Sequence, residues 1–144
     1  MIVREGKSVF KGVAIGKIFV YKKADNAVKK ETVADTAAEM ARFEAAKEKA
    51  LGQLKGLYEK ALKDVGEEEA MIFDVHQMLL DDPDYNDSIK DIIENEKMNA
   101  EYAVFMTSEQ FAAMFLSMDD DYMRGRAADI KDISERVISI LNGS

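Results

Sequence analysis

The sequence predicts a mainly α protein, a four-helix-type bundle preceded by a short N-terminal β segment. From about residue 36 to residue 141, apolar residues recur at the three- and four-residue spacing of helices, and capping residues mark the breaks. Residues 9–21 are instead rich in β-branched and aromatic residues, which favours strands. With 144 residues, 47% of them hydrophobic, the chain can bury a substantial core.

Two parts of unequal size are expected. Residues 1–30 should hold one or two short strands and a linker, and residues 31–144 should form the helical part. The first helix is expected to start at Thr36, because Thr36 and Glu39 have the spacing of a capping box. It should run to about Val65, where a glycine follows and ends it.

Four further helices follow from cap signals in the remaining sequence. Asp82 and Pro83 are typical of a helix start, Asn99 resembles an N-cap, and the acidic triplet 119–121 should open the last helix. The second and third helices are expected to act as one bent element, so that the bundle has about four members. The expected ranges are 67–80, 83–96, 99–118 and 119–141.

Charge is distributed unevenly along the chain. Residues 64–89 carry nine carboxylates and neither Lys nor Arg, so they supply more than the whole net charge of −8. A basic protein surface is therefore the expected partner, and nucleic acid is not, because phosphate binding requires clustered cations. There is no cysteine and no apolar run of signal or membrane length, so neither a disulfide scaffold nor a membrane is expected, and the chain is expected in the cytoplasm.

The helix predicted at 67–80 is apolar on two sides. A helix that needs one buried face has no structural use for a second, which indicates a docking surface. On periodicity alone, core packing is the commoner explanation for such residues. The bundle-facing stripe is Ala70, Phe73 and Leu80, and the surplus stripe is Met71, Ile72, Val75, Met78 and Leu79.

Catalytic groups are sparse in this sequence. His76 is the only histidine, and it lacks a glycine-rich phosphate-binding loop, while neighbouring Asp74 would repel a phosphoryl group. A partly buried histidine that is hydrogen-bonded to a carboxylate is compatible with its setting. The spacing of Glu68 and Asp82 permits acid–base chemistry, but no nucleophile or metal cluster accompanies them, so neither catalysis nor a metal site is expected.

Three segments together resemble the N-terminal part of Enzyme I of the bacterial phosphoenolpyruvate:sugar phosphotransferase system. They are KGVAIGK at 11–17, GEEEAMIFDVHQMLLDD at 66–82 and DDDYMRGRAADIKDI at 119–133. The first departs from the family's PGIAxGK pattern, with Lys11 in place of proline. In that family an all-helical subdomain binds the phosphocarrier HPr and is inserted into an α/β subdomain that carries the phosphorylated histidine.

The resemblance implies a carrier-binding role without intrinsic catalysis. The sequence stops before the family's GGxTSH phosphohistidine motif and before the barrel that binds phosphoenolpyruvate and magnesium. Magnesium is therefore expected only for the full-length enzyme, and dimerisation only through its C-terminal domain. No cofactor is expected in the chain itself.

The surface expected to bind HPr combines acids that steer a basic partner with apolar residues that supply affinity. Arg126 belongs to it by the resemblance, with a surface ion pair to Asp129 or Asp132 as the alternative explanation. Two other classes stay open: a self-associating structural bundle, and the carrier-docking domain of a related enzyme such as that of the nitrogen-regulatory branch. The expected site residues are Glu67, Glu68, Met71, Ile72, Val75, His76, Met78, Leu79, Asp82, Asp84, Tyr85, Phe115, Met123 and Arg126.

Overall fold

A computed structural model describes residues 28–143. The strands expected at residues 9–21 lie outside this range. Within it the structure is mainly helical, and Thr32 and Met98 form an isolated antiparallel bridge. No helix there is long and apolar enough to cross a membrane. The five helices are α1 (Thr36–Asp64), α2 (Glu67–Leu80), α3 (Pro83–Glu96), α4 (Ala100–Leu116) and α5 (Asp121–Leu141).

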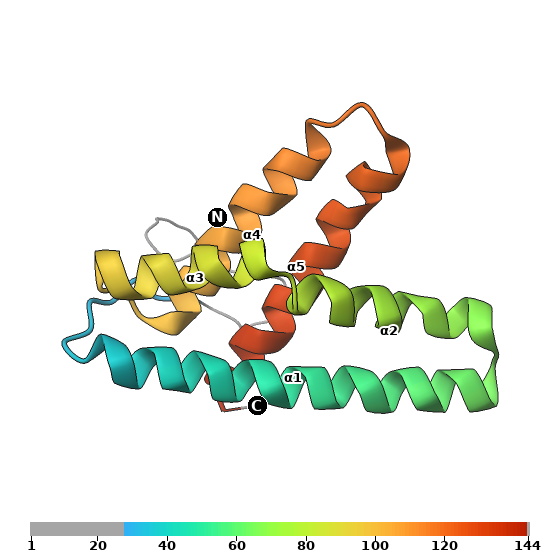
Figure 1. The fold of residues 1–144 in the computed structure, drawn as a ribbon, viewed down its shortest axis with the longest axis horizontal. Helices are drawn as coiled ribbons and strands as arrows, with labels where there is room; N and C mark the ends of the chain where they lie inside the picture. The colour runs from blue at the N-terminus through green and yellow to red at the C-terminus, as the bar shows by residue number, and fades with distance from the viewer. Residues whose placement is uncertain (1–27, 144) are drawn as a thin grey trace, which may run out of the picture.

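The helices form two layers (Figure 1). The long helix α1 makes the base, and α2 and α3 run back along it end to end, as expected of one bent element. The hairpin of α4 and α5 crosses this pair, and its connecting loop points away from α1. The result is a helical bundle in which α2 contacts α1 on one side and α5 on the other.

The core lies where the two layers cross. A residue that precedes α1 is also part of this core. Val28 is already buried in the core cluster, three residues before the expected start of the helical part. Burial of large apolar side chains from every helix contributes about 1.5 to 3 kcal/mol for each residue before entropy costs. Wholly or almost wholly buried are Phe43, Leu54, Leu80, Ile89, Ile93, Val104, Ile130, Ile133 and Ile138.

The start of α1 is capped differently from the expectation. The N-cap is Asp35, whose carboxylate accepts a hydrogen bond from the Ala38 amide at 3.0 Å. The expected Thr36–Glu39 capping box is therefore wrong. The Glu39 carboxylate instead accepts a hydrogen bond from the Ala100 amide at 2.7 Å, so it satisfies a free N–H in the first turn of α4.

The other helix ends largely follow the expected signals. Gly66 follows the end of α1 and has a φ of 122°, a conformation that residues other than glycine rarely adopt. Asp82 caps α3, and Asp120 caps α5. Asn99 is the N-cap of α4 by position, but its side chain accepts from the Glu31 amide and donates to the Lys29 carbonyl, each at 2.9 Å. The expected end of α4 at residue 118 is two residues too late, since α4 stops at Leu116.

A polar cluster ties three helix ends together at the side opposite the α4–α5 loop. The Arg42 guanidinium on α1 bonds Glu101 at the start of α4 and donates to the Leu141 carbonyl at the end of α5, at 3.0 Å each. Burial alone would raise the pKa of Glu101, but its hydrogen bond to Arg42 and the charge of that group hold the pKa below its usual value. We call Glu39, Arg42, Asn99 and Glu101 the anchor cluster.

Candidate docking surface

The two stripes predicted for α2 lie in different environments. Ala70 and Leu80 are wholly buried and Phe73 packs against the core, as expected of the bundle-facing stripe. The surplus stripe is open to solvent. Its exposed members are Met71, Ile72 and Met78, at 58%, 38% and 66%, while Val75 and Leu79 are half-buried.

Acidic side chains border the surplus stripe. Glu67 and Glu68 are exposed and precede Met71 by four and three residues, so helical geometry places them beside it. Asp84 is exposed in the first turn of α3, whereas Asp82 is half-buried and its carboxylate accepts from the Asp84 amide at 2.8 Å. The surface is thus apolar with an acidic margin, which suits a partner with a basic margin.

Tyr85 does not belong to this surface. It is wholly buried, its hydroxyl lies 2.7 Å from the Ser134 hydroxyl, and its ring stacks edge-to-face with Phe111. Burial raises the pKa of Tyr85 well above its ordinary value, outweighing the hydrogen bond to Ser134. The expectation of a surface contact is corrected, because the first turn of α3 directs this side chain into the core between α4 and α5.

The α4–α5 tip exposes apolar residues other than those expected. Phe115 is 7% exposed and packs in the core, so its expected surface role is corrected, and Met123 is half-buried against the core. The exposed side chains here are Met114, Leu116 and Tyr122. Tyr122 is the most exposed of the three, at 64%.

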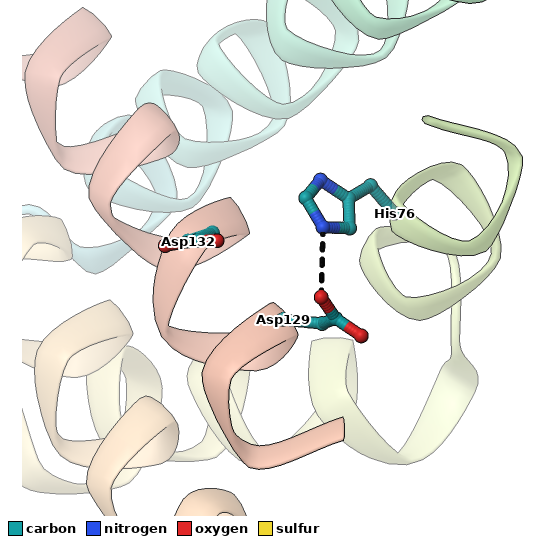
Figure 2. A group of neighbouring side chains, drawn as sticks. All are labelled: His76, Asp129 and Asp132. Carbon is teal, nitrogen blue, oxygen red and sulfur yellow. Dashed lines mark hydrogen bonds and ion pairs between the residues drawn. The ribbon is translucent and has the colours of Figure 1, made fainter. Parts of the chain in front are cut away.

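His76 faces α5 rather than solvent (Figure 2). Its Nε2 atom lies 3.2 Å from Asp129 Oδ1, and both side chains are buried. An ionised carboxylate can only accept, so the proton of this hydrogen bond resides on Nε2. The histidine is therefore hydrogen-bonded to a carboxylate, an arrangement that its sequence setting allowed. Only a small part of its side chain is open to solvent.

Arg126 contacts the Asp129 carboxylate from within α5. Its Nη1 atom lies 3.1 Å from Asp129 Oδ2, so one of the two ion pairs given above as the alternative explanation is present, although both side chains are mostly covered and not at the surface. Its guanidinium lies over the Tyr122 ring, 4.5 Å from the centroid. A charged group at this distance is attracted to the face of an aromatic ring.

One group of side chains in residues 28–143 has the spacing of metal ligands. His76, Asp129 and Asp132 each offer a ligand atom within 4.8 Å of the others. Asp129, however, already contacts an imidazole and a guanidinium, and the nearby positive charge of Arg126 opposes a dication. The absence of a metal site therefore stays a prediction.

Sequence comparison places this chain in a known family. Residues 5–126 match the family model described as PEP-utilising enzyme, N-terminal, and the chain belongs to this family. It is 44% identical over 139 residues to the phosphoenolpyruvate-protein phosphotransferase of Listeria monocytogenes and 44% identical over 138 residues to that of Geobacillus stearothermophilus. Each alignment covers 96% of this chain and 24% of the relative, so the chain spans about a quarter of their length.

Solved structures agree with the sequence relatives. An NMR solution structure of Enzyme I is 36% identical and aligns with a TM-score of 0.79 over 90% of this chain and 53% of the other. The N-terminal domain of the nitrogen Enzyme 1 is 27% identical and has a TM-score of 0.71 over 76% of this chain and 46% of the other. These matches confirm the resemblance to the N-terminal domain of Enzyme I and the helical-bundle class.

Proposed function

We propose that this chain docks an HPr-like phosphocarrier protein through the surplus stripe of α2 and the α4–α5 tip. The observation that carries the proposal is the exposure of Met71 and Met78 on a helix whose opposite face is buried. Methionine is flexible and polarizable, which suits a surface that binds and releases a partner repeatedly. The acids at 67, 68 and 84 would steer a basic carrier and set its orientation.

The interface would include most of the expected residues. Val75, Leu79 and Met123 are half-buried and could each contribute an edge of the side chain, and Arg126 lies beside the exposed ring of Tyr122. Tyr85 and Phe115 are left out because the core encloses them. His76 would support the surface from below through its hydrogen bond to Asp129. Asp82 would act mainly as the N-cap of α3.

In the whole protein this domain would serve phosphoryl transfer from phosphoenolpyruvate to the carrier during sugar uptake, in the cytoplasm. Magnesium binding and dimerisation would belong to parts outside this chain. The likeness to a nitrogen Enzyme 1 domain favours a carrier of the nitrogen-regulatory branch as the second candidate.

Calorimetric titration with a panel of HPr-like carriers from both branches tests the proposal. We expect saturable binding to at least one carrier, with an affinity that falls at high salt. Analytical ultracentrifugation of the free chain distinguishes a monomeric binder from a self-associating bundle. Binding to none of the carriers, together with dimerisation that is lost in Met78→Asp, would overturn carrier docking.

We also propose that the chain has no phosphotransferase activity of its own. Its only histidine is buried and bonded to Asp129, so Nε2 is not free to accept a phosphoryl group. Intact mass after incubation with phosphoenolpyruvate and magnesium should be unchanged. A gain of one phosphoryl group that His76→Ala removes would contradict this assignment.

A further inference from the structure

Asp129 links the docking helix to a surface cation. Its side chain is buried, and each carboxylate oxygen has its own partner: Oδ1 contacts His76 Nε2 on α2, and Oδ2 contacts Arg126 Nη1 on α5. The carboxylate is thus held from two helices at once, as Figure 2 shows for the histidine side. A carboxylate fixed at both oxygens has a defined orientation and can in turn fix a neighbouring donor.

Arg126 is confined but has unused hydrogen-bonding capacity. The guanidinium lies between Asp129 and the Tyr122 ring, and its side chain is only 18% exposed. Its Nε and Nη1 atoms are covered and make no hydrogen bond within the described residues, since the Nη1 contact to Asp129 is an ion pair without hydrogen-bond alignment, so the nitrogen left for an acceptor from outside is Nη2. A guanidinium carries five N–H donors, and leaving buried donors unpaired costs free energy.

We propose that Asp129, oriented by His76, is a positioning residue that holds the Arg126 guanidinium at the docking surface for an oxygen acceptor of the carrier. This inference rests on the proposed function, because the acceptor belongs to the docked partner. The planar donor fork of arginine matches carbonyl and carboxylate oxygens. Holding it in place before docking lowers the entropy cost of ordering a long side chain in the complex.

A metal ion is the competing occupant of this cluster. Binding a cation would require Asp129 to give up Arg126, or the cation to lie within a few ångströms of the guanidinium. Asp132, the third candidate ligand, is exposed on the next turn of α5. Like Asp129, it is an aspartate, so replacing it with asparagine removes the same charge. The variant Asp132→Asn is therefore the matched control for Asp129→Asn.

The first experiment needs no partner. NMR of the Arg126 Nε–Hε group reports how fast the guanidinium rotates and exchanges with water. We expect slow rotation in the wild type and in Asp132→Asn, and fast rotation in Asp129→Asn, with an intermediate rate in His76→Gln. Equal rates in wild type and Asp129→Asn would overturn the positioning role. So would stoichiometric Zn²⁺ shifts of the His76 ring signals that disappear in Asp132→Asn.

The second experiment measures carrier binding in a double-mutant cycle. Asp129→Asn should weaken affinity about two- to tenfold, the cost of ordering one long side chain, and should have almost no effect when Arg126 is already alanine. Thermal unfolding is recorded for each variant, and His76→Gln replaces Asp129→Asn if the latter does not fold.

The outcomes separate the two proposals. Additive losses from Asp129→Asn and Arg126→Ala would show that Asp129 acts through the fold and would overturn the positioning role. If the wild type binds no carrier, the proposed function is overturned. The proposal that a carrier oxygen accepts from Arg126 is then overturned as well. The rotation measurement still decides whether Asp129 holds the guanidinium.

Discussion

The two ends of this bundle use different chemistry. At the anchor cluster, charged and amide side chains bond to neighbouring elements, so that Arg42 joins three helix ends and Asn99 joins the segment before α1. At the candidate docking surface, apolar side chains of α2 and the α4–α5 tip are exposed to solvent, and Asp129 is buried. The difference shows that long-range polar contacts stabilise the fold at one end, while the other end keeps its surface available.

The largest expected contrast is between two neighbours on α2. Leu80→Ala should lower the free energy of unfolding by about 2 to 5 kcal/mol, because a wholly buried leucine leaves a cavity. Met78→Ala should change it by less than about 0.5 kcal/mol, because that side chain is 66% exposed. Urea unfolding measures both. A loss of more than about 2 kcal/mol in Met78→Ala would show that the surplus stripe is core.

The anchor cluster should be sensitive to the loss of its cation. Arg42→Ala should cost about 1 kcal/mol, since it removes bonds to Glu101 and to the Leu141 carbonyl, although partial exposure screens the charges. Lys60→Ala is the control, because the Lys60–Asp64 pair, with a separation of 3.3 Å, is well exposed. Thermal unfolding of the two variants should rank them in this order, and equal midpoints would remove the special role of the anchor cluster.

A pH effect should follow from Glu101. Arg42 holds the pKa of Glu101 below its ordinary value in the folded chain, so the folded state binds this proton less readily than the unfolded state. The resulting stability is present above the unfolded-state pKa and is lost as pH falls through the folded-state pKa. Glu101→Gln should therefore destabilise the chain more at pH 7 than at pH 3 in urea titrations. A difference that is independent of pH would contradict this sign.

The smallest effect on stability is expected from the acidic margin. Glu68→Lys and Asp84→Lys should each change the free energy of unfolding by less than about 0.5 kcal/mol, because both residues are exposed. In stopped-flow binding they should slow association with the carrier and flatten its dependence on salt, since exposed charges act through a field screened over roughly 8 Å. Glu59→Lys on α1, also exposed, is the control for net charge. Faster dissociation at unchanged association would show direct contact instead of steering.

Local signals in the sequence predicted the helices and the two faces of α2. Gly66, Asp82 and Asp120 act within a few residues of their own positions, and the Arg126–Asp129 pair has helical spacing, so sequence patterns were sufficient. The family motifs added the carrier as expected partner.

The failures involve partners that are distant in sequence. Glu39 bonds Ala100 and Asn99 bonds Lys29, separations of 61 and 70 residues that no local pattern reveals. Tyr85 was expected at the surface because periodicity does not show which helix will cover a face, and here α4 and α5 cover it. A hydrogen bond from His76 to a carboxylate was compatible with its sequence setting, but the partner, 53 residues away, could not be named.

Amide-shift mapping of the labelled chain with an HPr-like carrier tests the central claim most directly. The account predicts shifts concentrated on α2 from Glu67 to Leu79, at Asp84, and on the α4–α5 tip around Leu116 and Tyr122. It predicts small shifts around the anchor cluster at Arg42 and Glu101. Shifts concentrated at the anchor cluster, with α2 unchanged, would contradict the claim that the surplus stripe is the docking surface.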